Sequence, residues 1–162
     1  MDRFKHTKGE YKMRCEYTDG SNPDFAELCR QLDHNLDELV GGFEQRKNYV
    51  QYNTLENIHD VILFYDDDKP FACASFKYYE EGVAEMKRVF IRKEYRGQGF
   101  AVELVRTLEA TAREKGFQKM ILETGKPLFA AIKLYQKMGY RIIENYGQYK
   151  NMALSICMSK DL

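Results

Sequence analysis

The sequence predicts an α/β protein built on one mixed, mostly antiparallel sheet that is flanked by helices. Apolar runs of strand length alternate along the chain with longer segments whose apolar residues recur at i, i+3, i+4 and i+7. Turn residues at 66–70 and 80–82 join three successive strand patterns, which is typical of antiparallel hairpins. A long helical pattern then leads from the strand at 85–91 to another at 119–124, and such a crossover makes the two strands parallel.

In the N-terminal half, residues 1–9 carry no pattern and should be frayed, whereas residues 11–17 alternate like a half-buried strand. Asn22 and Pro23 then form the start signal of a helix. Its apolar face holds Phe25, Leu28, Leu32, Leu36 and Leu39, and glycines at 41 and 42 should end it. Residues 43–60 have poor periodicity, which favours a short helix followed by a loop. Residues 61–65 and 71–78 predict a hairpin that continues into the strand at 85–91.

The C-terminal half predicts two helices and three strands. The first helix opens at residue 100 and runs to about Lys115, with Gly116 as a plausible end residue. Residues 119–124 should form a strand, residues 126–137 a second helix, and residues 141–145 and 153–159 two final strands. No repeat or linker interrupts this order, so we expect one domain that covers residues 1–162.

Composition excludes several classes of function. The chain has 162 residues, of which 44% are hydrophobic and 31% charged, as expected for a globular domain. Lysine plus arginine equals aspartate plus glutamate at 25 each, so no overall field favours a nucleic acid or a membrane surface. No apolar run has the length of a membrane span, and the first residues lack a signal-peptide pattern, which leads us to expect a cytoplasmic location.

The cysteines and histidines do not form a metal-ligand pattern. Cys15, Cys29, Cys73 and Cys157 lie far apart in apolar stretches, which favours reduced core thiols over disulfides or a zinc site. The three histidines have no metal-ligand spacing either, so we expect no metal.

The most informative stretch is Arg96-Gly97-Gln98-Gly99-Phe100-Ala101, which follows an apolar strand and opens a helix. Two glycines let the backbone approach a ligand closely, and the helix N-terminus adds a partial positive charge, so this turn could hold an anion. A Walker P-loop would need Gly-Lys-Ser/Thr, but Phe100 follows Gly99. A dinucleotide-binding turn would need a third glycine where Val102 stands. An ordinary helix-capping turn remains an alternative.

Arg96-x-x-Gly99-x-Ala101 resembles the pyrophosphate-binding signature of the GNAT superfamily of acyl-CoA-dependent N-acyltransferases. The expected order of helices and strands is also that of the GNAT fold. The resemblance implies an N-acetyltransferase that moves an acetyl group from acetyl-CoA, its co-substrate, to a primary amine of a small molecule or peptide by direct attack. It also implies that the backbone binds this co-substrate at Val89, Phe90 and Ile91, and at Arg96, Gly97, Gln98, Gly99, Phe100 and Ala101.

The resemblance assigns two catalytic residues. Tyr135 lies in a segment similar to the family's A-x-x-L-Y-x-x-x-G-F/Y pattern, in which the tyrosine is the general acid for the departing thiolate; a core aromatic is the alternative. Glu85 matches the general base of the histone-acetylating branch, and a strand-edge glutamate paired with a basic neighbour is its alternative. Glu123, at the end of the parallel strand, is the reserve candidate. Many relatives have Asn or Gln where this chain has Leu128, so the resemblance implies a weaker hold on the pantetheine.

The residues around the site also suggest a class of acceptor. We expect its pocket between residues 43–58, the inner face of 71–78 and the loop at 146–149, and the tyrosines there with Glu85 and Glu123 suggest a small cationic amine. A covalent intermediate on Cys73 or Cys157 is not expected, because no histidine lies near either in sequence. The competing hypothesis is a CoA-binding regulatory or interaction module without catalysis. We expect a monomer or homodimer.

Overall fold

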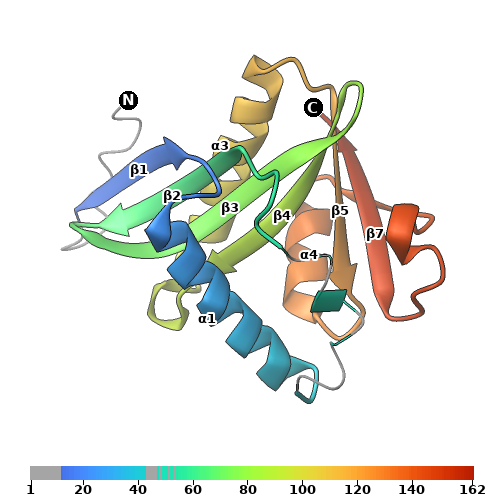
Figure 1. The fold of residues 1–162 in the computed structure, drawn as a ribbon, viewed down its shortest axis with the longest axis horizontal. Helices are drawn as coiled ribbons and strands as arrows, with labels where there is room; N and C mark the ends of the chain where they lie inside the picture. Colours follow the sequence, from blue (N-terminus) through green and yellow to red (C-terminus); the bar gives the residue numbers. More distant parts are fainter. Residues whose placement is uncertain (1–11, 43–46, 48, 51, 53) are drawn as a thin grey trace.

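One mixed sheet of seven strands organises the structure, a computed structural model that describes residues 12–42, 47, 49–50, 52 and 54–162 (Figure 1). The strands lie in the order β1-β2-β3-β4-β5-β7-β6. Their bounds are Met13–Thr18 (β1), Asp60–Asp66 (β2), Lys69–Glu80 (β3), Val83–Ile91 (β4), Lys119–Gly125 (β5), Arg141–Ile143 (β6) and Ser155–Asp161 (β7). Among these strands β4 and β5 form the one parallel pair. The predicted mixed, mostly antiparallel sheet is therefore confirmed.

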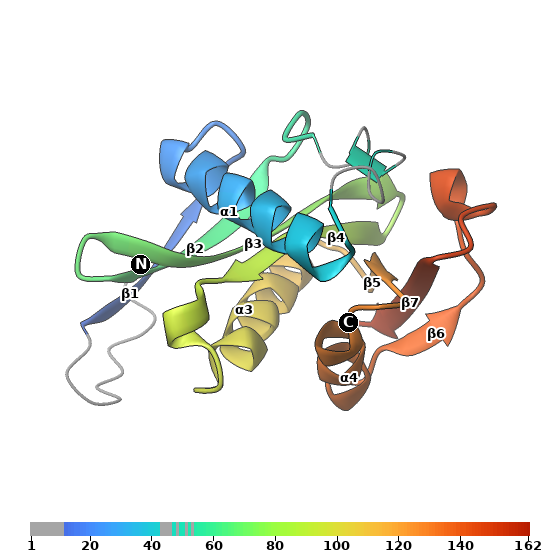
Figure 2. The same ribbon diagram turned by 90° about the horizontal axis from the view of Figure 1, so that it is seen from below.

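In the part of the chain whose helix bounds the structure describes, three helices cover the sheet: α1 (Pro23–Leu39), α3 (Phe100–Glu114) and α4 (Phe129–Lys137). α1 starts where the sequence predicts, because the Asn22 side chain accepts hydrogen bonds from the backbone N–H groups of Asp24 and Phe25 at 2.9 and 3.3 Å. α3 ends just before Gly116, whose φ of 90° is the left-handed conformation that glycine adopts at such ends. α1 lies over one face of the sheet, and α3 and α4 lie over the other (Figure 2).

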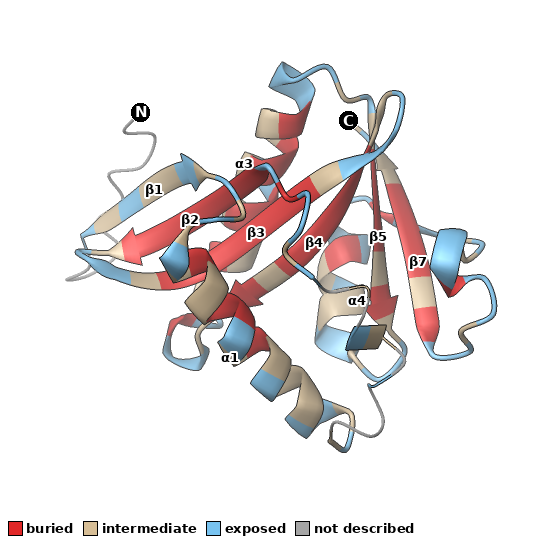
Figure 3. Cartoon of the chain, viewed as in Figure 1, coloured by how far each residue is buried: buried red, intermediate tan, exposed pale blue. Residues whose placement is uncertain are grey.

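The two faces carry separate cores because successive strand residues point to opposite sides. Val61, Leu63 and Tyr65 of β2 pack in the cluster under α1, whereas Ile62 and Phe64 pack in the cluster under α3. The central strands are consequently buried on both faces (Figure 3). Charged side chains that are buried on such a strand need partners nearby, and β4 carries charged side chains of this kind.

Some boundaries differ from the sequence expectations. The second C-terminal helix begins at Phe129 rather than at Lys126, because residues 126–128 form a turn closed by the Leu128 N–H on the Gly125 carbonyl at 2.9 Å. β6 ends at Ile143, and the side-chain amide of Asn145 then contacts the carbonyl oxygens of Tyr149 and Met152 at 3.1 and 3.2 Å. The last strand begins at Ser155 instead of residue 153.

Two expectations fall outside the described residues. The frayed segment 1–9 is one of them, and residues 43–46, 48, 51 and 53 of the short helix and loop expected at 43–60 are the other. Within the described part of the chain, no helix has the length and apolarity needed to cross a membrane.

Candidate active site

The site begins where β4 and β5 separate. Their parallel pairing covers three residues of each strand, Val83 to Glu85 against Lys119 to Ile121. Beyond Glu85, β4 continues for six residues to Ile91 with no pairing to β5, and the two strands diverge in Figure 1. An unpaired sheet edge leaves backbone N–H and C=O groups that need partners. This edge of β4 can therefore receive an extended ligand.

A distortion in β4 shapes that edge. Arg88 has a φ of 58°, and the register with β3 shifts between Cys73, which faces Phe90, and Ser75, which faces Lys87. Side chains of β3 fix the distortion: the Ser75 hydroxyl donates to the Lys87 carbonyl at 2.6 Å, and the Cys73 thiol to the Arg88 carbonyl at 3.3 Å. These are the features of a β-bulge. It begins one residue before the three positions that the resemblance assigns to acyl and pantetheine binding.

The Arg88 side chain extends under α1 rather than into the gap. Its guanidinium donates to Asp33 at 2.9 Å and to the Cys29 carbonyl at 2.8 Å. These contacts tie the bulge to α1, so Arg88 is a structural anchor for the edge strand.

The glycine turn lies directly after this edge. A short 3-10 turn (Lys93–Tyr95) connects it to β4, and the buried Tyr95 ring stacks on Phe71 at 4.2 Å while its hydroxyl donates to Asp66 at 2.9 Å. Gly97 and Gly99 follow with φ values of 73° and 86°. Both φ values lie in the region that L-residues with side chains rarely adopt.

The N-terminus of α3 is open toward a ligand. The Gly99 cap has no side chain to accept hydrogen bonds, and the first helical bond runs from the Glu103 N–H to the Gly99 carbonyl at 3.3 Å. The N–H groups of Phe100, Ala101 and Val102 precede that bond and point out of the helix end. Arg96 borders them, with its Nε held by the Ile91 carbonyl at 2.9 Å. The sequence prediction of an anion-binding turn fits this geometry.

A cleft of about 210 Å³ adjoins the turn. It lies between α1 and the end of β4 and is lined by Gln31, His34, Asn35, Glu38, Phe90, Arg92, Lys93, Glu94 and Arg96.

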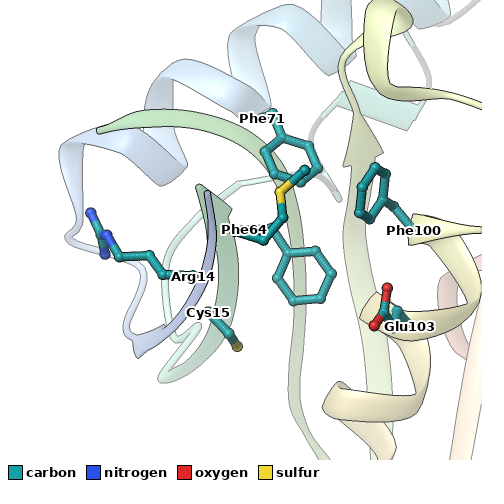
Figure 4. A pocket seen from close by; sticks show the side chains of 7 residues that line it. Arg14, Cys15, Phe64, Phe71, Phe100 and Glu103 are labelled. Atoms are coloured by element: carbon teal, nitrogen blue, oxygen red, sulfur yellow. The ribbon is translucent and has the colours of Figure 1, made fainter. Parts of the chain in front are cut away.

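A second, smaller pocket lies between β1, β2 and α3, where Phe64, Phe71 and Phe100 surround it with Cys15 at its edge (Figure 4). Its volume of about 20 Å³ suits roughly one water molecule, so it is not a substrate site.

The charged residues of the site gather on the α1 face of the sheet. Glu85 is 2% exposed, and its carboxylate accepts a hydrogen bond from the Tyr146 hydroxyl at 2.7 Å. Lys87, two residues further along β4, is also buried. Glu123 projects from β5, on the far side of the gap. Because residues two apart on a strand point to the same face, Lys87 lies on the face of Glu85. This spacing is visible in the sequence and could have identified Lys87 as a site residue.

The environment of Glu123 alters its acidity. Burial raises the pKa of its carboxyl group to about 7, and the nearby Glu85 carboxylate acts in the same direction. A hydrogen bond from Ser155 and the positive charge of Lys87 oppose the increase. A carboxyl group with this pKa can accept a proton near neutral pH.

Tyr135 lies on the opposite face. It projects from α4 into the core under α3 and α4, where its ring meets that of Tyr140 edge-on at 5.7 Å. Within residues 12–42 and 54–162, no group hydrogen-bonds its hydroxyl, and burial raises its pKa, so the hydroxyl stays protonated. The structure thus places Glu85 and Glu123 on one face of the sheet and Tyr135 on the other, on α4, which lies beside β4 and β5 in Figure 1.

The described residues contain no cluster of three His, Cys, Asp or Glu side chains that could hold a metal ion. The features assembled at this site are the separated strands, the bulge and the uncapped glycine turn. Each of them fits the extended, pyrophosphate-bearing shape of a CoA thioester.

Comparison with known proteins gives the family. The acetyltransferase (GNAT) family model matches residues 25–140, which is well over half of the chain and includes β4, the glycine turn and α4. The chain belongs to the GNAT family. This GNAT chain is 40% identical over 57 residues to N-acetyltransferase 8 from Homo sapiens, a match that covers 35% of this chain and 25% of the human protein.

Solved structures confirm the fold. A Klebsiella pneumoniae protein assigned as an acyl-CoA N-acyltransferase superposes with a TM-score of 0.75 at 27% identity, over 93% of this chain and 97% of that one. A GNAT acetyltransferase from Elizabethkingia anophelis with acetyl-CoA bound superposes with a TM-score of 0.66 at 17% identity, over 93% and 98% of the two chains. The chain spans between 25% and 54% of the length of the curated relatives it matches.

Proposed function

We propose that this GNAT protein is an acetyl-CoA-dependent N-acetyltransferase that acetylates a primary amine by direct attack. The observation that carries the proposal is the separation of β4 from β5. The N-terminus of α3, which lacks a side-chain cap, and the acidic side chains of Glu85 and Glu123 accompany this separation. Acyl transfer to an amine needs a phosphate clamp, a donor for the thioester oxygen, a base and an acid. The site offers a candidate for each.

The clamp is the backbone from Arg96 to Ala101. Its outward N–H groups and the helix dipole favour the pyrophosphate of CoA. The unpaired edge of β4 at Val89, Phe90 and Ile91 follows the bulge and can hydrogen-bond the pantetheine amides and the thioester oxygen. A backbone donor held by the surrounding sheet needs little reorganisation as negative charge develops on that oxygen.

Glu123 is the base that the structure favours. Its pKa of about 7 matches the task of removing a proton from an ammonium group near neutral pH. The Glu85 carboxylate, in contrast, is already engaged by a hydrogen bond from the Tyr146 hydroxyl at 2.7 Å. Glu85 then contributes its negative charge, which favours proton uptake by Glu123. Glu85 remains the alternative base because the sequence resemblance assigns it that role.

Tyr135 is the acid. Its protonated hydroxyl donates a proton to the CoA sulfur as the tetrahedral intermediate collapses and the carbon–sulfur bond breaks. The nitrogen releases its second proton to solvent to give the amide, and solvent returns a proton to Tyr135. A thioester on cysteine is disfavoured, because burial raises the pKa of both Cys73 and Cys157. Buried, protonated thiols are poor nucleophiles.

The charges also bear on the acceptor. The carboxylates of Glu85 and Glu123 attract an amine in its ammonium form, against the positive charges of Lys87 and Lys77. Tyr79, 5.2 Å from the Tyr146 ring, keeps an exposed face that can contact a cation. We therefore propose a small cationic amine as the acceptor class.

A thiol-release assay tests the proposal. Acetyl-CoA is mixed with the protein and a panel of polyamines, aminoglycosides, amino acids and peptides, and free CoA thiol is followed. Within the panel, cadaverine and aminocaproate form a matched pair in which an ammonium replaces a carboxylate, and we expect cadaverine to react faster. Tight binding of acetyl-CoA without turnover of any amine would instead support a CoA-binding module that lacks catalysis.

A further inference from the structure

Lys87 holds together two segments that come from distant parts of the chain. Its ammonium donates to the Tyr52 carbonyl at 2.9 Å and to the Tyr149 hydroxyl at 3.3 Å. Tyr52 precedes β2, and Tyr149 belongs to the 3-10 turn between β6 and β7 (Gly147–Tyr149). The rings of the two tyrosines also meet edge-on, with centroids 5.8 Å apart. One buried ammonium on β4 therefore joins two of the regions expected to enclose the acceptor.

Burial of this ammonium needs compensation. Lys87 is 8% exposed, and burial lowers its pKa, as do the positive charges of Lys77 and Arg88, while the carboxylates of Glu85 and Glu123 act to raise it. A lysine kept only for packing is more easily replaced by an apolar side chain, because desolvating a charge is costly. Two oxygen acceptors fix the position of the ammonium, and the Glu85 and Glu123 carboxylates stabilise its charge, which indicates a role for the charge itself.

Lys87 is not placed to act as the base. Two of its protons are engaged by oxygen acceptors, so the nitrogen serves as a donor. Its contacts are with Tyr52 and Tyr149, and its charge acts on Glu123 across the gap. These contacts are those of a residue that acts through its neighbours.

We propose that Lys87 is a positioning residue for acetyl transfer: its ammonium fixes Tyr52 and Tyr149 as walls of the acceptor site and keeps Glu123 able to take the proton from the amine. This inference rests on the proposed function. The charge of Lys87 favours the ionised form of Glu123, while Glu85 favours the protonated form. The other titratable groups that act on or are affected by Glu123 are Tyr149 in the 3-10 turn and Cys157 on β7.

The test compares Lys87→Met, which keeps roughly the length of the side chain but removes its charge, with Lys87→Arg, which keeps the charge. Steady-state rates are measured from pH 5.5 to 9.5 with acetyl-CoA saturating and then with the acceptor saturating. For Lys87→Met we expect the acceptor KM to rise about tenfold. The fall of kcat/KM at low pH, its acidic limb, should move up by about one pH unit. The acetyl-CoA KM should stay within about twofold of the wild type, because the clamp is untouched. Lys87→Arg should restore the acidic limb.

Tyr149→Phe separates the two parts of the role. It removes one partner of the ammonium without changing any charge, so the acceptor KM should rise while the acidic limb stays in place. A folded Lys87→Met protein with wild-type KM and an unchanged acidic limb would overturn the proposal. A lower melting temperature with unchanged kinetics would give Lys87 a purely structural role.

A measurement without turnover keeps this test distinct from that of the proposed function. Carbon-13 NMR of the glutamate side chains can follow the titration of Glu123 in the wild type and in Lys87→Met, with Glu123→Gln used to assign the signal. A higher Glu123 pKa in Lys87→Met supports the inference, and an equal pKa contradicts it. If the wild type acetylates no amine in the panel, the proposed function fails whatever the titration shows.

Discussion

Replacing Glu123 with glutamine should reduce activity and increase stability at the same time. In the folded protein the Glu123 pKa is raised from its ordinary value of 4.5 to about 7, mainly by burial. A shift of one pKa unit corresponds to 1.36 kcal/mol, so the ionised side chain opposes folding by roughly 3 kcal/mol. Glutamine carries no charge to desolvate, and it also cannot accept a proton from the substrate.

The pH dependence of stability has a definite sign. Because the folded-state pKa lies above the unfolded-state pKa, the folded protein binds more protons between about pH 4.5 and 7. The contribution of Glu123 to stability therefore falls as the pH rises through that window. Glu123→Gln should be more stable than the wild type by up to roughly 3 kcal/mol at pH 8, and this advantage should fade toward pH 4.5. Urea unfolding at both pH values measures it.

The kinetic effect runs in the opposite direction. For the wild type, kcat/KM should fall about tenfold per pH unit below an apparent pKa near 7, when measured with an alkyl amine that itself titrates above about pH 10. Glu123→Gln should lose this limb and about 10²–10⁴-fold in kcat/KM at pH 7.5.

Glu85→Gln is the matched control, since it removes the other carboxylate. It should move the acidic limb to lower pH without abolishing it, because the Glu85 charge raises the Glu123 pKa. Near-wild-type activity of Glu123→Gln with its acidic limb intact would exclude Glu123 as the base. A larger loss in Glu85→Gln than in Glu123→Gln would transfer the role of base to Glu85.

Three further substitutions test the other parts of the site. Tyr135→Phe removes a hydroxyl without a described partner, so stability and acetyl-CoA affinity should hardly change. The measured kcat should drop about 10²–10⁴-fold, and a smaller drop would make Tyr135 a core aromatic. Gly99→Val should sharply weaken acetyl-CoA binding in calorimetry. Gly116→Val, with a similar φ of 90° at the other end of α3, controls for backbone strain. Equal acetyl-CoA affinities of the two variants would contradict the clamp. Cys157→Ala should retain turnover, and a folded but inactive variant would refute direct attack.

Much of the fold could be predicted because its signals are local. The Asn22 cap, the apolar stripe of α1 and the glycine after α3 act within one or two helical turns, and the structure has both helices where these signals occur. Apolar runs bounded by turn residues likewise predict β2, β3 and β4 with ends that differ by a few residues. The glycine turn belongs to this group, since its conformation depends on residues 96–101 themselves.

Only the tertiary structure decided how the site is assembled and which carboxylate titrates near neutral pH. The separation of β4 from β5 after Glu85 depends on distant pairings along the whole sheet, and the bulge at Arg88 is held by Ser75 and Cys73 from another strand. No local pattern shows that Lys87 meets Tyr52 and Tyr149. The acidity of Glu123 depends on burial and on charges from a neighbouring strand, which exist only once the chain has folded.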